Sequence, residues 1–143
     1  MQDNISPDHI LQIGFGFWAS KTLLSAVELG LFSRLADGPK TGPELQDAMG
    51  LDPRGTYDFL DTLVALGLLQ REGAGETGKY ANTPSAALFL VKQSPHYIGG
   101  ILEMANARLY TFWGSLTEGL LALTDEGFVT DPRFSDPFSD PAP

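Results

Sequence analysis

The amino-acid sequence predicts a mainly α-helical fold with a winged-helix-like unit that carries a two-stranded β wing. Three observations lead to this fold class. Apolar residues recur at helical spacing over most of the chain, glycines and prolines separate the helical stretches, and two short strand-like runs flank a glycine-rich turn at 73–78. We expect one domain over residues 1–123, with the wing unit at about 41–83.

The first helical stretch runs from about Ile10 to Leu29, and its first half is apolar on nearly every face. Ser6 and Pro7 before it are typical of a helix start. A helix that is apolar all round is normally buried, and in a chain of 143 residues two of its faces can be covered only by a partner. Gly14 and Gly16 weaken the helix by about 1 kcal/mol each relative to alanine, but they allow another backbone to approach closely.

The wing unit follows a short helix at 31–36 and is predicted from two capped helices and a strand pair. Thr41 and Glu44 have the spacing of a capping box, and Asp52 with Pro53 is typical of the start of the second helix. The order is that of a winged helix. It comprises a helix at 43–49, a helix at 52–66, a strand at 68–72, a turn at 73–78 and a strand at 79–83.

A short helix at 86–91 and a long helix from Tyr97 to Leu123 complete the predicted domain. The long helix contains four glycines but no proline. From Thr124 onward, four prolines and five acidic residues accompany a single basic residue, Arg133. Such a segment has little to pack, so we expect residues 124–143 to be an acidic, proline-rich, disordered tail or linker.

Composition excludes several classes of function. Nine basic and 18 acidic residues give a net charge of −9, the sign opposite to that of a nucleic-acid-binding groove. The absence of cysteine excludes disulfides, a thiol nucleophile and thiolate metal sites, and two histidines are too few for a histidine-rich metal site. The N-terminus lacks the pattern of a signal peptide, and no stretch reaches about 18 uninterrupted apolar residues. We therefore expect a cytoplasmic protein that binds neither nucleic acid nor membrane.

Catalytic and cofactor-binding motifs are weak. Residues 73–78 have the spelling G-x-G-x-x-G, but a dinucleotide loop needs a helix after it, and here a strand follows. Glu72 and Glu76 would also repel phosphate, so a β-turn is the better interpretation. His9 and His96 are the only near-neutral bases, and solvated or capping histidines are commoner than catalytic ones. We assign no catalytic, metal-binding or cofactor-binding residue.

A winged helix suggests DNA binding through its second helix, here residues 52–66. That helix carries Asp52, Asp58 and Asp61 against a single Arg54. A reading helix presents Arg, Lys, Asn or Gln to the base edges, so this charge pattern opposes DNA binding. A winged-helix transcriptional regulator is kept as an alternative.

The last predicted helix contains an aromatic and methionine cluster, which we call the last-helix cluster. Its members recur at three- and four-residue spacing, which predicts one shared face. They are Met104, Arg108, Leu109, Phe112 and Trp113. The cluster is either part of the core or one wall of an apolar small-molecule pocket with Arg108 as a polar anchor, and the sequence leaves both open.

Five strings carry a resemblance to a known family. They are AVELGLF at 26–32, TGPEL at 41–45, LDTLVALGLL at 60–69, KYANTP at 79–84 and FWGSL at 112–116. Together they resemble the N-terminal dimerisation region of small-molecule O-methyltransferases that use S-adenosylmethionine (SAM), of the plant natural-product, antibiotic and melatonin-forming type. The resemblance covers about Ile10 to Leu123.

The resemblance implies a homodimer, formed through the N-terminal and last helices, whose winged helix does not bind DNA. It implies that the last-helix cluster lines the pocket of a small aromatic acceptor, and that Phe15 and Trp18 reach the pocket of the partner. The family's Rossmann-like catalytic domain, with its SAM-binding loop and its base, has no counterpart in these residues. We therefore expect this chain to bind no SAM and to be inactive alone. A non-catalytic ligand-binding or scaffold protein derived from a methyltransferase is the second alternative.

Overall fold

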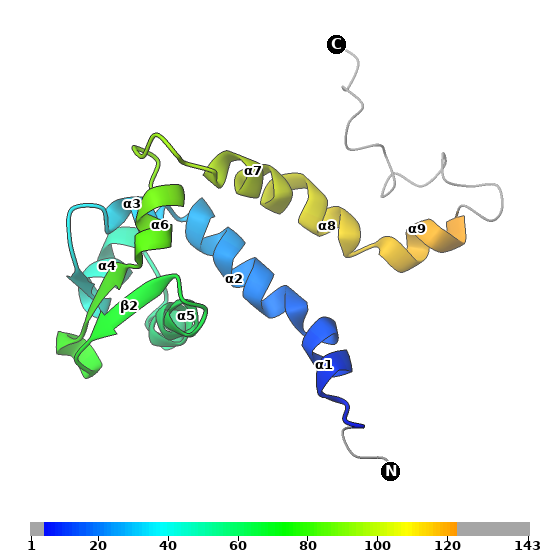
Figure 1. The fold of residues 1–143 in the computed structure, drawn as a ribbon, viewed down its shortest axis with the longest axis horizontal. Coiled ribbons are helices and arrows are strands. Elements are labelled where there is room, and N and C mark those ends of the chain that lie inside the picture. The colour runs from blue at the N-terminus through cyan, green and yellow to red at the C-terminus, as the bar shows by residue number, and fades with distance from the viewer. Residues whose placement is uncertain (1–4, 123–143) are drawn as a thin grey trace. The chain divides into compact units, whose positions relative to one another are not determined.

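The computed structural model describes residues 5–122, so the predicted tail at 124–143 lies outside the described residues. Helices predominate and are accompanied by one small antiparallel sheet, which confirms the expected mainly α-helical class (Figure 1). The chain divides into two compact units, residues 1–100 and residues 101–143.

The helices and strands of the first unit alternate in the order expected for a winged helix. They are α1 (Asp8–Gly14), α2 (Gly16–Glu28), α3 (Leu31–Arg34), β1 (Lys40–Thr41), α4 (Gly42–Met49), α5 (Pro53–Ala65), β2 (Leu69–Glu72), the 3₁₀ turn η1 (Gly75–Thr77), β3 (Lys79–Asn82) and α6 (Pro84–Phe89).

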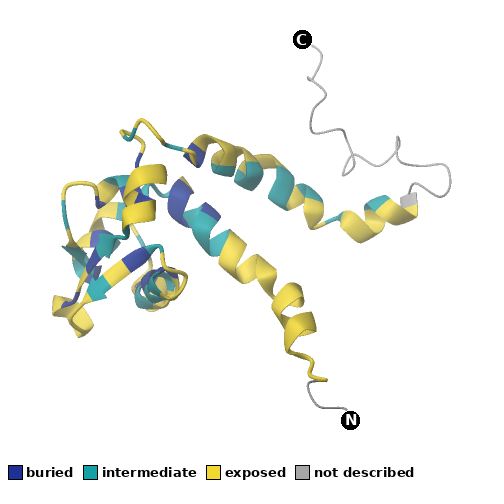
Figure 2. Cartoon of the chain, viewed as in Figure 1, coloured by how far each residue is buried: buried dark blue, intermediate teal, exposed yellow. Residues whose placement is uncertain are grey.

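The predicted first helix is in fact two helices, α1 and α2, which meet at Phe15. α1 has no buried residue, whereas α2 is buried towards its C-terminal end at Leu24, Ala26 and Val27 (Figure 2). The exposed and buried parts of this segment therefore have different roles, and only the second contributes to the core of the chain.

The core of the first unit forms where α2 packs against α3 and α5, and where α4, α5 and α6 contact the strands. Its largest fully buried side chains are Tyr80, Phe32, Leu31, Leu45, Leu60, Leu63 and Leu69. Complete burial of one such aliphatic or aromatic side chain contributes about 1.5 to 3 kcal/mol to stability. The wing unit thus supplies most of the apolar burial that holds the first unit together.

Helix capping follows the sequence prediction. Thr41 Oγ1 accepts a hydrogen bond from the Glu44 amide at 3.2 Å and lies 3.1 Å from the Glu44 carboxylate. Asp52 Oδ1 accepts from the Arg54 amide at 2.8 Å. Gly50 ends α4 with a φ of 65°, in the left-handed region that a residue with a side chain rarely adopts.

The sheet has three strands in the order β1-β3-β2, with both neighbouring pairs antiparallel. The sequence predicted only β2 and β3. Strand β1 is added by the pairing of Lys40 with Tyr80 and of Thr41 with Lys79. A two-residue strand is too short to show an alternating pattern, and it forms only because the fold brings it beside β3.

The prediction of one regular helix from 97 to 123 is wrong. The segment begins as α7 (Gly99–Met104), widens into a π-helical turn, η2 (Ala105–Leu109), and continues as α8 (Tyr110–Trp113). A turn at Gly114 and Ser115 then separates it from α9 (Leu116–Ala122). Neither interruption contains a proline, and only the second contains a glycine, Gly114, so the π-helical turn had no helix-breaking residue to mark it in the sequence.

Within residues 5–122, the segment Asp8–Glu28 is long and apolar enough to cross a membrane by length and composition alone. Its 21 residues include the glycines and the lysine that interrupt the apolar run in the sequence. A single helix of this kind is weak evidence for a membrane span, because the core helix of a soluble protein and a signal sequence pass the same test.

Candidate functional site

Large apolar side chains are exposed along α1 and the first half of α2, which we call the α1–α2 apolar surface (Figure 2). They are Ile10, Leu11, Ile13, Phe15, Phe17 and Trp18, and the most exposed, Ile10, keeps 72% of its accessible surface. Soluble monomers rarely expose contiguous apolar patches of more than a few hundred Å². Such a surface is typical of a helix that is buried against another protein.

Three aromatic rings gather where α1 meets α2. Phe15 stacks on Trp18 with 4.7 Å between ring centroids and 14° between ring planes. Phe17 packs edge-on against Trp18 at 5.6 Å. Aromatic pairs of this kind contribute about 0.5 to 1.5 kcal/mol beyond their buried area. The structure therefore brings the two candidate residues, Phe15 and Trp18, into contact.

Phe17 completes this aromatic group and was not singled out from the sequence. Residues one and two positions apart do not share a face in a regular helix, so spacing gave no signal for it. Phe17 and Trp18 are consecutive residues of α2, and Phe15 directly precedes that helix. The usable signal was the composition of the stretch, in which three of four consecutive residues are aromatic.

The last-helix cluster lies within ten consecutive residues of the chain. Met104 ends α7, Arg108 and Leu109 belong to the π-helical turn η2, and Phe112 and Trp113 belong to α8. Met104 and Trp113 keep 36% and 66% of their accessible surface. These two apolar side chains can therefore still bury area against a ligand or another chain.

Two charged side chains of the predicted DNA-reading helix, α5, form ion pairs within the fold. Arg71 Nη1 on β2 donates to both carboxylate oxygens of Asp61, at 2.7 and 2.8 Å. The Tyr80 hydroxyl on β3 donates to Asp61 Oδ1 at 2.7 Å. At the start of α5, the only basic residue of the helix, Arg54, pairs with Asp52 at 3.2 Å. This arrangement supports the expectation that the unit does not read DNA.

Tyr80 connects the sheet to α5 from a completely buried position. Burial is the main cause that raises the pKa of its phenol well above the usual range, and the hydrogen bond to Asp61 adds to it. The Arg71 guanidinium lies 5.1 Å from the centre of the Tyr80 ring. The three side chains fix the wing to the helix, and none of them is placed for acid–base catalysis.

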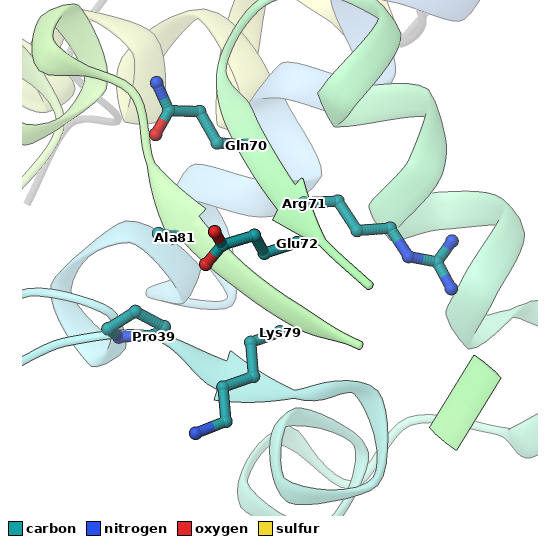
Figure 3. A pocket seen from close by; sticks show the side chains of 6 residues that line it. All are labelled: Pro39, Gln70, Arg71, Glu72, Lys79 and Ala81. Atoms are coloured by element: carbon teal, nitrogen blue, oxygen red, sulfur yellow. The ribbon is translucent and has the colours of Figure 1, made fainter. Parts of the chain in front are cut away.

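A shallow cavity of about 320 Å³ lies against strands β2 and β3 (Figure 3). It is lined by Pro39, Gln70, Arg71, Glu72, Lys79 and Ala81. Figure 3 shows the Arg71 side chain extending away from Glu72, and Glu72 lies opposite Lys79 in the antiparallel register of β2 and β3. Small-molecule sites are mostly apolar, whereas four of the six residues that line this cavity are polar or charged.

A smaller groove of about 260 Å³ lies between α2 and α5, bordered by Leu29, Leu51 and Phe59. It is open and mainly apolar, and it continues from the buried end of α2. His9 on α1 and His96 in the loop before α7 are both exposed. Neither histidine lines one of these two cavities.

Comparison with known proteins identifies the part of a larger enzyme that this fold resembles. A family model for the O-methyltransferase dimerisation domain matches residues 11–92. The chain is 46% identical over 114 residues to the tetracenomycin polyketide synthesis 8-O-methyl transferase of Streptomyces glaucescens. That match covers 80% of this chain and 33% of the relative.

Two solved structures with 29% sequence identity show the same fold. Human N-acetylserotonin methyltransferase in complex with SAM matches with a TM-score of 0.74, over 85% of this chain and 36% of the other. An O-methyltransferase family 2 protein from Planctomyces limnophilus in complex with apigenin matches with a TM-score of 0.64, over 71% and 30%. The chain thus spans about a third of the length of the relatives that it matches.

Proposed function

The chain belongs to the O-methyltransferase dimerisation-domain family, and we propose that it forms the homodimerisation and acceptor-pocket region of a cytoplasmic, SAM-dependent O-methyltransferase. The observation that carries this proposal is the α1–α2 apolar surface, which a single chain leaves uncovered. We assign residues 1–123 to this region and residues 124–143 to a tail or linker. SAM is bound by the catalytic domain of the family, so the region alone is inactive.

Dimerisation follows from the energetics of the α1–α2 apolar surface. Obligate interfaces bury more than about 2,000 Å², and apolar area contributes about 25 cal/mol per Å². The surface includes six large apolar side chains with at least 47% of their area exposed. Burial of this surface against a second copy removes it from water on both chains, so the isolated monomer is the less stable state.

The proposed acceptor is a flat aromatic molecule with a hydroxyl group. The last-helix cluster forms one wall for it, and Phe15 and Trp18 of the partner form another. The named relatives act on a tetracenomycin polyketide and on N-acetylserotonin, and one neighbour was solved with apigenin. All three compounds contain aromatic rings, which apolar and aromatic side chains contact well.

The dimer is tested by light scattering behind size exclusion over a hundredfold range of concentration. The expected mass is twice the 15.4 kDa of one chain. Phe17→Glu should give a monomer, because it places a charge in the apolar interface. Leu88→Glu is the matched control, since Leu88 on α6 is about as exposed as Phe17, at 43% against 47%. A well-folded parent monomer, or a dimer insensitive to Phe17→Glu, would refute the proposed interface.

Acceptor binding is tested by titration with apigenin and detection of tryptophan fluorescence. The chain has two tryptophans, and both Trp18 and Trp113 belong to the proposed acceptor site, so the signal reports on the site itself. Phe112→Ala should weaken binding about tenfold, because it removes a large apolar contact. Leu88→Ala should leave the affinity unchanged. Equal affinities of the parent and Phe112→Ala would contradict the acceptor assignment.

A further inference from the structure

The π-helical turn η2 lies in the middle of the last-helix cluster. A π turn closes hydrogen bonds between residues five apart, so it contains about one residue more than an α turn. An α-helix advances about 100° per residue, so one extra residue turns every later side chain back by about 100° relative to the earlier ones. π turns are rare in proteins, and those that occur are often found at functional sites.

This rotation decides whether the cluster shares one face. In an uninterrupted α-helix, Leu109, Phe112 and Trp113 would point about 140°, 80° and 180° away from Met104. With one residue taken up by the turn, the same three side chains lie about 40°, 20° and 80° from Met104. The predicted three- and four-residue spacing therefore does not by itself give one face, and the π turn is needed to join the two halves of the helix.

The same alignment adds Ile101 to the face. Ile101 precedes Met104 by three residues, which places it about 60° from Met104 on the side of Leu109 and Trp113. It keeps 65% of its accessible surface. Ile101, Met104, Leu109, Phe112 and Trp113 then fall within an arc of about 100°, the width of an apolar helix face. We call these five residues the aligned face.

We propose that the π turn Ala105–Leu109 is the positioning element of the acceptor wall, and that Ile101 is a further acceptor-contacting residue. This inference rests on the proposed function. The aligned face extends over about 18 Å of helix, and it presents aliphatic side chains, a thioether and two aromatic rings in one row. A flat aromatic molecule with a hydroxyl group is the ligand that such a row contacts along its length.

The alignment can be tested without any acceptor. Met104→His with Leu109→His places two imidazoles five residues apart, which the π turn brings to one side and a regular α-helix would separate by about 140°. The double variant should bind Zn²⁺ at least about tenfold more tightly than either single variant. Asp58→His with Thr62→His, four residues apart on α5, is the positive control. If the control pair binds Zn²⁺ tightly and the 104/109 pair does not, the π turn is not formed and the inference fails.

The consequence for the acceptor is tested with apigenin. Deletion of the exposed Ala107 removes the one extra residue that the π turn accommodates. The turn then becomes an α turn, and the residues on its two sides keep their relative directions, so the deletion should preserve binding. Insertion of two alanines after Tyr110 turns Phe112 and Trp113 by about 200° and should abolish binding. Ile101→Ala should weaken binding about fivefold to tenfold.

The outcomes separate this inference from the proposed function. A parent chain that does not bind apigenin refutes the acceptor role and, with it, the positioning of an acceptor wall. Binding by the parent that is weakened by Phe112→Ala but survives the two-alanine insertion refutes the positioning alone. Circular dichroism of the insertion variant must show the helix content of the parent. If the insertion variant unfolds, Ile101→Ala decides, and an unchanged affinity overturns the inference.

Discussion

Removal of the Asp61 carboxylate should destabilise the wing unit more than any other single surface charge on α5. In Asp61→Ala, the buried Tyr80 hydroxyl loses its acceptor at 2.7 Å and Arg71 loses both of its hydrogen bonds to the carboxylate. A hydrogen bond to a charged group contributes about 1.5 to 3 kcal/mol, and an unpaired buried polar group costs about 1 to 3 kcal/mol. The Asp61 side chain is 44% exposed, so solvent screening reduces the ion-pair part. We expect a loss of about 2 to 4 kcal/mol in the free energy of unfolding.

The assay is urea unfolding followed by circular dichroism at one fixed protein concentration, because the stability of a dimer depends on concentration. Asp58→Ala is the matched control, since Asp58 is an exposed aspartate on the same helix. Its substitution should change the free energy of unfolding by less than about 0.5 kcal/mol. A loss below about 1 kcal/mol in Asp61→Ala would show that the Asp61–Arg71–Tyr80 contacts do not hold the wing to α5.

Two further predictions concern the same unit. Gly42→Ala should lower the free energy of unfolding by about 1 to 2 kcal/mol, because a Cβ atom there would lie 2.6 Å from Tyr57 Cε1. Gly55→Ala in α5 should instead raise it by up to about 1 kcal/mol, because a Cβ atom at that position meets nothing within 4 Å and alanine favours the helix. Equal unfolding midpoints for the two variants would contradict this difference. Because the pKa of Tyr80 is raised in the folded state, its contribution to stability is complete below the unfolded-state pKa of about 10 and is lost as pH rises above it. Tyr80→Phe should remove this part of the alkaline decline in stability, and an unchanged decline in urea unfolding at pH 9 to 11 would exclude Tyr80 as its source.

The predicted features that the structure confirms are those set by local chemistry. Thr41 with Glu44 and Asp52 with Pro53 specify helix starts because side-chain oxygens and the proline ring act within one turn of the backbone. Strand β1 depends instead on a neighbour that is about 40 residues away in the sequence. No local pattern of two residues carries that information.

The candidate site shows the same division between local and non-local information. The resemblance to the methyltransferase family singled out Phe15 and Trp18, and the structure adds the contact of Phe17 with Trp18. The π turn at Ala105–Leu109 is a change in hydrogen-bond register, and all of its residues are compatible with an ordinary α-helix. Helical periodicity therefore located the last-helix cluster but could not give the rotation between its two halves.

The distribution of burial separates the parts of the chain by role. Helix α1 buries no residue, so its apolar side chains contribute nothing to the core of one chain and increase its tendency to associate. The wing unit is in the opposite situation, because its core is fully buried and Asp61 accepts hydrogen bonds from both Arg71 and Tyr80. An apolar helix on a unit that is already stable is explained by association, since folding does not require it. This contrast is the physical reason to assign association to the α1–α2 apolar surface and a structural role to the winged helix.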